Sequence, residues 1–409
     1  KMDEDDADEG ATTEVEPPLP LSSFDPSKMA KDLDLLALRL RVQHIQTAMK
    51  EIRHHLLNMS RQANAIEPPP STTPEETPKG EKIVLLSRDF KDAESLPDEV
   101  KAFVDRTQCK VVRHTLCLRY SNFTYEEVVR EHLPKGIDVP SSFETIGHVA
   151  HLNLRGSQLP YRLVIAKVMQ DKYPQIKTVL TKVGTIQNTF RVFSMEVLSD
   201  AVGGEVPRIA KPGDPALETV VKQHGCTFKM NFGEVYWNSR LEQEHKRLVS
   251  TFRKTDEIWD MMAGIGPFAV PAAKLVGCKV FANDLNPRST HYLEVNCKAN
   301  KVEGKVEVFT LCAREFLRRR VIACGMDGPP EGVTAIHCIM NLPATSPDFT
   351  DCFKGAFEAS VWRGRLPKCH VYAFSKNSDP KICAEEILQR VAERIGVLPL
   401  GATWHEVRD

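Results

Sequence analysis

The sequence predicts a protein of the α/β class whose C-terminal part contains a parallel sheet with helices between its strands. Residues 256–287, DEIWDMMAGIGPFAVPAAKLVGCKVFANDLNP, have the pattern of a buried strand, a glycine turn, a helix and a second strand. Two further apolar runs, VEVFT (306–310) and VTAIHCIM (333–340), have the length and composition of buried strands. Strands and helices therefore alternate through 256–375, which indicates βαβ units.

The glycine turn and the strand that follows it indicate a nucleotide-type cofactor pocket. Gly264 and Gly266 allow a tight turn where the backbone approaches a ligand closely, and Pro267 is expected as the first residue of the next helix. The second strand ends in Asp284, a carboxylate placed to accept both hydroxyls of a ribose at the carboxyl edge of a parallel sheet. This is the Rossmann arrangement.

The glycine spacing does not by itself name the cofactor. Gly264 and Gly266, with Ala269 and an acid about 20 residues on, also satisfy the dinucleotide fingerprint, so an NAD-binding function stays open at this point. Pro267, however, has no N–H to donate to a pyrophosphate at the helix start. S-Adenosylmethionine carries no phosphate and loses nothing from that proline.

Length and charge permit several domains and a nucleic-acid partner. With 409 residues, the chain is long enough for two or three domains. Residues 1–80 hold 9 Lys and Arg against 15 Asp and Glu, which leaves 45 against 40 for 81–409, so a mildly basic body follows an acidic leader. Eleven scattered cysteines without a C-x-x-C pair predict a reducing compartment and no structural metal. No apolar run is long enough for a membrane span.

The N-terminal part is expected to contain a disordered leader and a helical region. Residues 1–22 are acidic and poor in apolar side chains, which is typical of disorder. Apolar residues recur at helical spacing from Asp32 to Leu57, which predicts an amphipathic helix or a helical pair. The proline-bearing segment 65–80 predicts a linker.

Further strands and helices complete a small α+β domain over 23–135. Strands are expected in KIVLLS (82–87) and KVVRHTLCLRYS (110–121), with the helix DEVKAFVDRT between them. A helix at 125–133 is followed by Pro134 and Gly136, which supports a domain boundary near 135.

The middle block, 136–235, is predicted to be rich in strands around one helix. The helix is expected in QLPYRLVIAKVMQDKYP, and the strands in IGHVAHLNL (146–154), KTVLTKV (177–183), NTFRVFSMEVLSD (188–200) and, as a strand pair, CTFKMNFGEVYW (226–237). Basic residues on this sheet would form either an RNA-facing surface or a solvated face, and spacing alone leaves both open: Arg155, Lys177, Lys182 and Arg191.

Residues 236–409 form the third predicted domain. A helix is expected in SRLEQEHKRLVSTFRK, where Glu242 and Glu244 come early and basic residues come late, the order that suits the helix dipole. A strand HVYAFS (370–375) and a helix AEEILQRVAERIG (384–396) follow the strands named above. The chain begins at Lys1 rather than Met, so we expect a preceding segment, and its end soon after a turn predicts that a last strand is missing.

Six motifs occur along the chain in order. They are IGHVAHLNLR with QLP (146–160), FRVFSMEVLSD (190–200), VYWNSRLEQEH (235–245), DMMAGIGPFAVPAA (260–273), FANDLNP (281–287) and MNLPA (340–344). With these motifs the chain resembles the archaeal and eukaryotic tRNA (guanine-N1)-methyltransferases, which act on the guanosine at position 37, beside the anticodon. The resemblance covers about 24–409. It implies a small domain that checks the outer shape of tRNA, a middle domain that binds the anticodon region, and a Rossmann catalytic domain.

The resemblance also implies which residues act. Guanine N1 becomes nucleophilic towards a sulfonium methyl only as its proton leaves, so a carboxylate base suits the reaction. Glu244 matches the family's general base, Arg191 the arginine that stabilises the charge on guanine O6, and Asn341 the side chain that positions the base. S-Adenosylmethionine is expected to contact a larger set: His245, Gly264, Gly266, Asp284, Leu285, Cys312, Ala313 and Asn341.

The partners implied are the anticodon stem-loop and outer corner of tRNA, with no membrane, no metal and a monomeric enzyme. The target guanine is expected to leave its stack, as nucleobase enzymes require. Similarity to eukaryotic members predicts the cytoplasm, the nucleus and the mitochondrial matrix as locations, by analogy and without a visible targeting signal.

Two positions depart from the family pattern. Ser239 stands where the family has a proline before Arg240, and Cys312 stands where it has an aspartate that contacts the adenine side of the cofactor. Three alternatives remain open: the paralogous wybutosine-pathway aminocarboxypropyl transferase, a tRNA-binding protein with a decayed catalytic site, and an NAD-dependent oxidoreductase. The NLPA loop and the residues around Glu244 favour methyl transfer.

Overall fold

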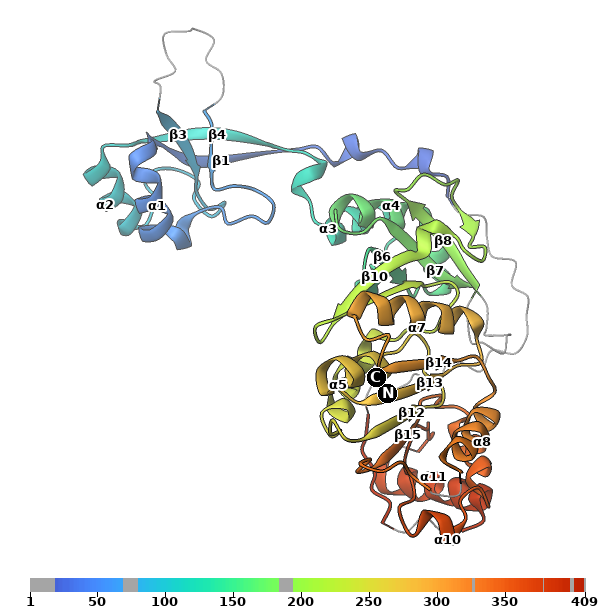
Figure 1. The fold of residues 1–409 in the computed structure, drawn as a ribbon. Coiled ribbons are helices and arrows are strands. Elements are labelled where there is room, and N and C mark those ends of the chain that lie inside the picture. Colours follow the sequence, from blue (N-terminus) through green and yellow to red (C-terminus); the bar gives the residue numbers. More distant parts are fainter. Residues whose placement is uncertain are drawn as a thin grey trace. The chain divides into compact units, whose positions relative to one another are not determined.

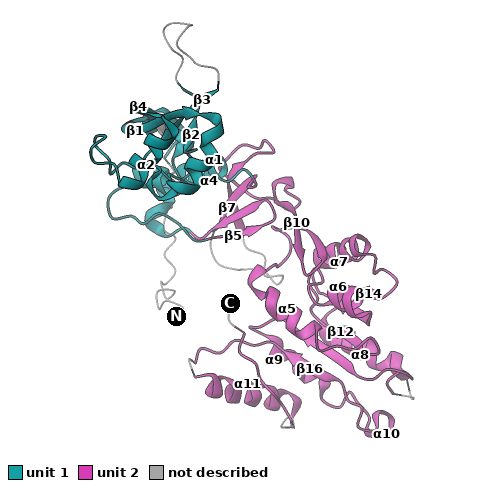
Figure 2. Ribbon diagram, turned by 90° about the vertical axis from the view of Figure 1, so that its left-hand side faces the viewer, with its two compact units in different colours: residues 1–142, 154–174 teal, residues 143–153, 175–409 magenta. Residues whose placement is uncertain are grey.

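The structure, a computed structural model, describes residues 19–68, 80–183, 194–325, 328–377, 379–397 and 401–407. The chain divides into two compact units, coloured separately in Figure 2. Unit 1 comprises Lys1–Ser142 with Leu154–Pro174, and unit 2 comprises Phe143–Asn153 with Gln175–Asp409. The three-domain division expected from the sequence stays a prediction, and the expected disorder over 1–22 falls mostly outside the described residues.

Unit 1 is built on an antiparallel sheet in the order β2-β3-β1-β4. Strands β1, β3 and β4 are labelled in Figure 1. Its strands are β1 (Lys31–Arg41), β2 (Ala65–Ile66), β3 (Glu81–Leu85) and β4 (Lys110–Leu118), and its helices are α1 (Ile45–Glu51), α2 (Asp98–Thr107), α3 (Tyr125–His132) and α4 (Arg162–Lys172). The predicted strands at 82–87 and 110–121 and the helix at 125–133 are confirmed. The predicted linker is wrong at its start, because residues 65–66 pair with β3.

The predicted helix from Asp32 to Leu57 is wrong over its first part, which forms the central strand β1. The strand is buried on both sides of the sheet: Leu36 and Leu38 lie in one apolar cluster, whereas Leu35 and Ala37 lie in another. Successive residues of a strand point to opposite faces, so a strand covered on both sides carries a nearly continuous apolar run. Pairing with β3 and β4 outweighs the helical propensity of leucine, alanine and arginine. The second part does contain a helix, α1.

Unit 2 contains three sheets among the described residues. The first, mixed in direction, has the order β5-β6-β7-β8-β9: β5 (Phe143–Ile146), β6 (Val149–Leu152), β7 (Thr178–Val183), β8 (Ser194–Asp200) and β9 (Arg208–Ile209). The second is the hairpin of β10 (Glu218–Gln223) and β11 (Cys226–Asn231). The third is parallel, in the order β14-β13-β12-β15-β16: β12 (Glu257–Asp260), β13 (Lys279–Asn283), β14 (Val306–Phe309), β15 (Ile336–Met340) and β16 (Lys368–Val371).

Helices connect and flank these strands. Those of unit 2 are α5 (Glu242–Val249), α6 (Ala269–Pro271), α7 (Pro287–Asn300), α8 (Ala313–Cys324), α9 (Ser346–Phe349), α10 (Ala359–Trp362) and α11 (Pro380–Ile395). The parallel sheet confirms the Rossmann-type prediction for this part of the chain. The strand predicted at 370–375 begins and ends earlier, as β16.

Two predicted strand assignments in the middle of the chain are wrong in their pairing. The run 146–154 contributes to the hairpin β5–β6 rather than to one strand, because Gly147 turns the chain with a φ of +60°. A Cβ there would lie 2.2 Å from Thr219 Oγ1, so glycine is required. The run 226–237 supplies the single strand β11, whose partner β10 was not predicted from the sequence; residues 224–225, both with positive φ, make the turn.

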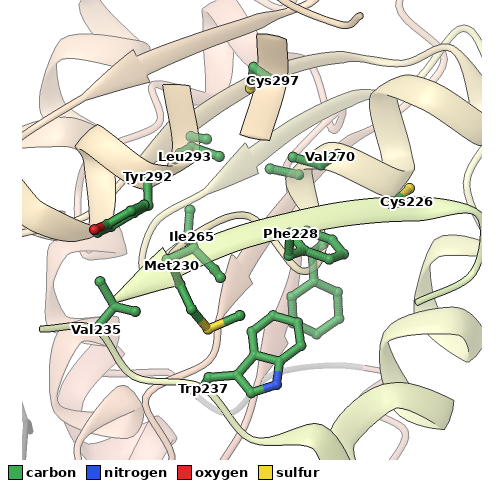
Figure 3. Close-up of a cluster of buried hydrophobic side chains, with 14 of the residues drawn as sticks. Cys226, Phe228, Met230, Val235, Trp237, Ile265, Val270, Tyr292, Leu293 and Cys297 are labelled. Atoms are coloured by element: carbon green, nitrogen blue, oxygen red, sulfur yellow. The ribbon is translucent and has the colours of Figure 1, made fainter. Parts of the chain in front are cut away.

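One apolar core joins the β10–β11 hairpin to the parallel sheet within unit 2. The rings of Phe228 and Trp237 lie 5.3 Å apart, and they share a cluster with Ile265 of the glycine turn and Leu293 of α7 (Figure 3). Burial of such large side chains is the main favourable term in folding. The hairpin and the parallel sheet are therefore parts of one folded body.

Two asparagines of α7 cover the edge of the hairpin. Asn296 accepts a hydrogen bond from the Lys229 N–H (2.7 Å) and donates to the Lys229 carbonyl (3.2 Å), and Asn300 pairs in the same way with Thr227 (2.9 and 2.7 Å). Asn296 also donates to the carbonyl of Ile265 (3.1 Å). The side-chain amides thus make the hydrogen bonds that a neighbouring strand would make to this edge. The bond from Asn296 to Ile265 also holds the glycine turn against α7.

Candidate active site

The candidate site lies at the carboxyl ends of the parallel strands. Asp260 ends β12, Asp284 follows β13, and Asn341 follows β15. The strand order reverses between β12 and β15, since the chain builds β12, β13 and β14 to one side and β15 and β16 to the other. Open α/β sheets bind their ligands at this edge, where the order reverses.

The glycine turn orients the carboxylate of Asp284. Gly264 has a φ of +54° and its N–H donates to Asp284 Oδ2 at 2.8 Å, while the N–H of Asn286 donates to Oδ1 at 2.8 Å. Gly266 has a φ of +98°, and a Cβ there would lie 2.5 Å from Leu293 Cδ1. The prediction that Pro267 starts the helix is wrong: α6 starts at Ala269, because residue 267 still belongs to the turn. The structure thus brings Gly264 of the turn into hydrogen-bond contact with Asp284, whereas Gly266 packs closely against Leu293.

A second buried carboxyl, Asp260, lies close to Asp284. Burial and the charge of Asp284 raise the pKa of Asp260 to about 8, against the backbone N–H of Met262, which favours the charged form. Burial also raises the pKa of Asp284, against the backbone N–H donors that favour its charged form. Two acids thus lie at the ends of neighbouring strands, and burial keeps one of them neutral. Such a pair can offer hydrogen-bonding groups to a ligand.

The loop after β15 leaves one acceptor unpaired. The N–H of Leu342 donates to Ser346 Oγ at 2.8 Å, and that hydroxyl donates to the carbonyl of Met340 at 2.8 Å, so the loop is held on both sides of Asn341. Asn341 Oδ1 is buried without a partner among the described residues. A buried carbonyl oxygen without a donor is costly, so it is suited to accept a hydrogen bond from a ligand.

Glu244 lies on the first turn of α5 and is 8% exposed. Arg247 Nε donates to Glu244 Oε2 at 2.6 Å and Nη2 donates to Oε1 at 2.7 Å, and the hydroxyl of Tyr372 donates to Oε1 at 2.6 Å. Burial alone would raise the pKa of this carboxyl, but the hydrogen bonds from Arg247 and Tyr372 lower it below its ordinary value. The expected base is therefore an ionised, fully oriented carboxylate.

His245, next to the base, is a buried neutral imidazole. Burial lowers its pKa to about 4, and neither ring nitrogen has a partner among the described residues. Its ring lies 4.7 Å from that of Phe268, which in turn lies 5.7 Å from the ring of Tyr372. Phe268 belongs to the glycine turn, so its ring brings the α5 residues and the expected cofactor turn into one site.

The remaining expected contacts lie at two strand ends. Leu285 is 49% exposed and offers an apolar surface beside Asp284. Cys312 is exposed at the N-cap of α8 and makes no side-chain cap hydrogen bond, and Ala313 is the first residue of that helix. Arg191, the predicted O6 partner, lies outside the described residues.

Comparisons with known proteins identify the family. A model of the TRM5/TYW2 methyltransferase domain matches residues 219–359, and a model of the TYW2 N-terminal domain matches 125–201. The tRNA (guanine(37)-N(1))-methyltransferase of Phytophthora infestans is 40% identical over 391 residues, which cover 94% of this chain and 88% of that protein. The chain belongs to the tRNA (guanine(37)-N1)-methyltransferase family. This membership excludes the NAD-dependent oxidoreductase that the glycine spacing alone left open.

Other members and solved structures agree. The human tRNA (guanine(37)-N(1))-methyltransferase is 34% identical over 402 residues, covering 95% of this chain and 73% of that protein. Trm5b from Pyrococcus abyssi covers 88% of this chain and 91% of its own, with a TM-score of 0.54 and 20% identity. The complex of aTrm5 and tRNALeu covers 86% and 91%, with a TM-score of 0.58 and 21% identity. These structures share the α/β fold of the tRNA (guanine(37)-N1)-methyltransferase family.

Sequence reasoning missed three residues of this family member's site. Asp260 lies in the DMMAG motif, and its place at a strand end was the available signal. Arg247 stands three residues after Glu244, a spacing that brings side chains together on a helix. Tyr372 lies 128 positions from Glu244, and no local pattern joins them. Within the described ranges, no helix is long and apolar enough to cross a membrane.

Proposed function

We propose that this protein transfers a methyl group from S-adenosylmethionine to N1 of guanosine 37 in tRNA, with Glu244 as the general base. One observation carries the proposal beyond family membership: the oriented Glu244 carboxylate and the glycine turn meet at the carboxyl edge of the sheet, joined through Tyr372 and Phe268. A base and a cofactor site must lie together for a proton to leave N1 as the methyl group arrives.

The residues present fit S-adenosylmethionine. The Asp284 carboxylate is held by two backbone N–H groups and keeps lone pairs for ribose hydroxyls, and a Cβ on Gly264 would meet no described atom within 4 Å. Exposed Leu285 can pack on an adenine ring. His245 and Asn341 present polar atoms without described partners, and Cys312 and Ala313 would contribute through their backbone.

When bound, S-adenosylmethionine supplies an electrophilic methyl group on its sulfonium. Glu244 accepts the proton from guanine N1, whose freed electron pair attacks that methyl group. Asn341 positions the guanine, and negative charge that develops on O6 is stabilised by hydrogen-bond donors, for which Arg191 is proposed. Glu244 is already ionised, so it need not lose a proton of its own before it accepts one from guanine.

The proposed substrate requires a base that leaves its stack. A flipped guanine can reach the buried Glu244, whereas a stacked base cannot. We further propose that the enzyme acts as a monomer on the anticodon stem-loop and outer corner of tRNA. The cytoplasm, nucleus and mitochondrial matrix are its proposed locations.

A second candidate is the aminocarboxypropyl transfer of the related TYW2 enzymes, because the family model that matches residues 125–201 carries that name. One experiment separates the candidates: labelled S-adenosylmethionine is incubated with a tRNA transcript carrying guanosine at position 37, or adenosine there, and nucleosides are analysed by mass spectrometry. N1-methylguanosine from the first transcript and no product from the second supports methyl transfer. An aminocarboxypropyl product supports the second candidate, and no product with tRNA still bound supports a decayed site.

A further inference from the structure

Arg247 covers the catalytic face of the proposed base. Its guanidinium binds both oxygens of Glu244, with Nε to Oε2 at 2.6 Å and Nη2 to Oε1 at 2.7 Å. The side chain of Arg247 is 41% exposed, whereas that of Glu244 is 8% exposed. The arginine therefore lies on the solvent side of a buried carboxylate.

The two oxygens of Glu244 are not equivalent. Oε1 also accepts a hydrogen bond from the Tyr372 hydroxyl at 2.6 Å, whereas Arg247 is the one donor that contacts Oε2 among the described residues. If a proton arrived while Arg247 stayed in place, a neutral acid would face a cation and the ion pair would be lost. Removal of Arg247 would free Oε2 and leave Oε1 anchored by Tyr372.

We propose that Arg247 is a removable counter-ion of Glu244: a phosphate of the bound RNA draws the guanidinium away, and Oε2 becomes the atom that accepts the N1 proton while Tyr372 holds Oε1. Arg247 and Tyr372 are then positioning residues. The step balances: the N1–H proton passes to Oε2, the electron pair stays on N1 and forms the new N–C bond, and the C–S bond breaks with its pair on sulfur. This inference rests on the proposed methyl transfer.

Phosphate is the anion that suits the exchange. A guanidinium binds phosphate through the same pair of parallel N–H donors that it offers to a carboxylate, and RNA brings phosphates beside every base. The partly exposed Arg247 can reach solution, and a partly exposed ion pair is readily exchanged for another. The RNA-free protein thus holds Glu244 as an ionised but covered carboxylate.

The other titratable groups around Glu244 come from three elements besides α5. They are His245 on α5, His370 and Tyr372 on and after β16, His405 in the C-terminal segment, and Asp260, which interacts with Tyr372. Burial lowers the pKa values of His245 and His370 to about 4, so both are neutral above about pH 5. Arg247 is charged at every pH of such an assay. Its removal therefore takes away a positive charge at every pH and raises the pKa of Glu244.

The test compares pH profiles of Arg247→Ala and the wild type from about pH 3 to about pH 8.5, because the pKa of free Glu244 lies below its ordinary value. Each profile is measured as kcat/KM for tRNA and as the single-turnover rate constant at saturating tRNA. The first reports ionisation in the free enzyme and the second ionisation in the complex. Loss of the cation raises the pKa of free Glu244, so the acidic limb of kcat/KM should move to higher pH. The limb of the single-turnover rate should not move, because Arg247 has already left Glu244 in the complex.

Controls keep the result specific. Tyr372→Phe should raise both limbs, because Tyr372 keeps its bond to Oε1 in both states. Arg318→Ala removes an arginine with the same three-residue spacing and two-point contact to Glu315 on exposed α8, and should move neither limb. The salt dependence of tRNA binding should weaken in Arg247→Ala by about one phosphate contact.

Two outcomes overturn the proposal. If Arg247→Ala moves both limbs, the arginine stays on Glu244 in the complex; if it moves neither, the arginine does not set the ionisation of the base. A wild-type protein that transfers no methyl group would instead count against the proposed function, so the two failures are distinguishable.

Discussion

We predict that the free energy of unfolding of the wild type falls as pH rises towards 8, and that replacement of Asp260 by asparagine removes most of this fall. Asp260 is fully buried at the end of β12, and burial with the nearby Asp284 raises its pKa from an ordinary 3.8 to about 8. Because the folded-state pKa is raised, the folded protein binds a proton that the unfolded chain has lost between these pH values. The contribution of Asp260 to stability therefore falls as pH rises from about 4 to about 8.

The size of the effect follows from about 1.4 kcal/mol for each pKa unit. Between pH 6 and pH 8, Asp260 should lower the wild-type free energy of unfolding by about 2 kcal/mol. Urea denaturation at pH 6, 7 and 8 measures this change by linear extrapolation. Asp260→Asn and Asp260→Ala both lack the titrating group, so both should lose this slope even if a buried amide or a cavity lowers their stability at every pH.

Equal slopes in the wild type and both variants would show that Asp260 does not carry this pH dependence. In that case Asp260 would be ionised in the folded protein at neutral pH, and burial would not outweigh the backbone N–H of Met262, which lowers its pKa. The protonation state of Asp260 matters for function because it sets the charge at the proposed cofactor site. If Asp260 is neutral, Asp284 is the one negatively charged member of this pair of acids.

Three further predictions concern the cofactor turn and its neighbours. Gly266→Ala should lower the free energy of unfolding by about 1–3 kcal/mol, because its Cβ would lie 2.5 Å from Leu293 Cδ1 at a φ of +98°; urea denaturation measures it, and an unchanged midpoint would contradict the crowding. Gly264→Ala, at a φ of +54° with open space around its Cβ, should weaken S-adenosylmethionine binding in calorimetry by about tenfold or more and disturb the fold less than Gly266→Ala. Cys312→Asp should raise stability by about 1 kcal/mol, because it adds the missing N-cap acceptor to α8; a lower melting temperature would contradict this.

Much of the parallel sheet could be predicted from the sequence because its signals are local. The strands around 306–310 and 333–340 are short apolar runs, and Gly264 stands about 20 residues before Asp284, a spacing that brings them to the same edge. The structure places them in hydrogen-bond contact at 2.8 Å. These features can be predicted without knowing which distant segments of the chain pair with each other.

Features set by distant contacts could not be predicted. The central strand β1 has residues that favour helices, and only its pairing with β3 and β4 makes it a strand. Strand β10 has few apolar residues, and its six residues pair in antiparallel register with β11. The hydrogen bond between Tyr372 and Glu244 joins two elements far apart in the chain. Arg247 was visible in the sequence as a basic residue late in the helix, but its contact with both oxygens of the base was not.

The most direct test of the central claim is the single-turnover rate of methyl transfer by Glu244→Gln, with tRNA affinity measured in parallel. Glutamine keeps the shape of the side chain and an oxygen that can accept from Tyr372, but it cannot take the N1 proton. We expect tRNA to bind to this variant as it does to the wild type, and methyl transfer to slow by about 10²–10⁴. Weaker tRNA binding with an unchanged single-turnover rate would contradict the assignment of Glu244 as the base.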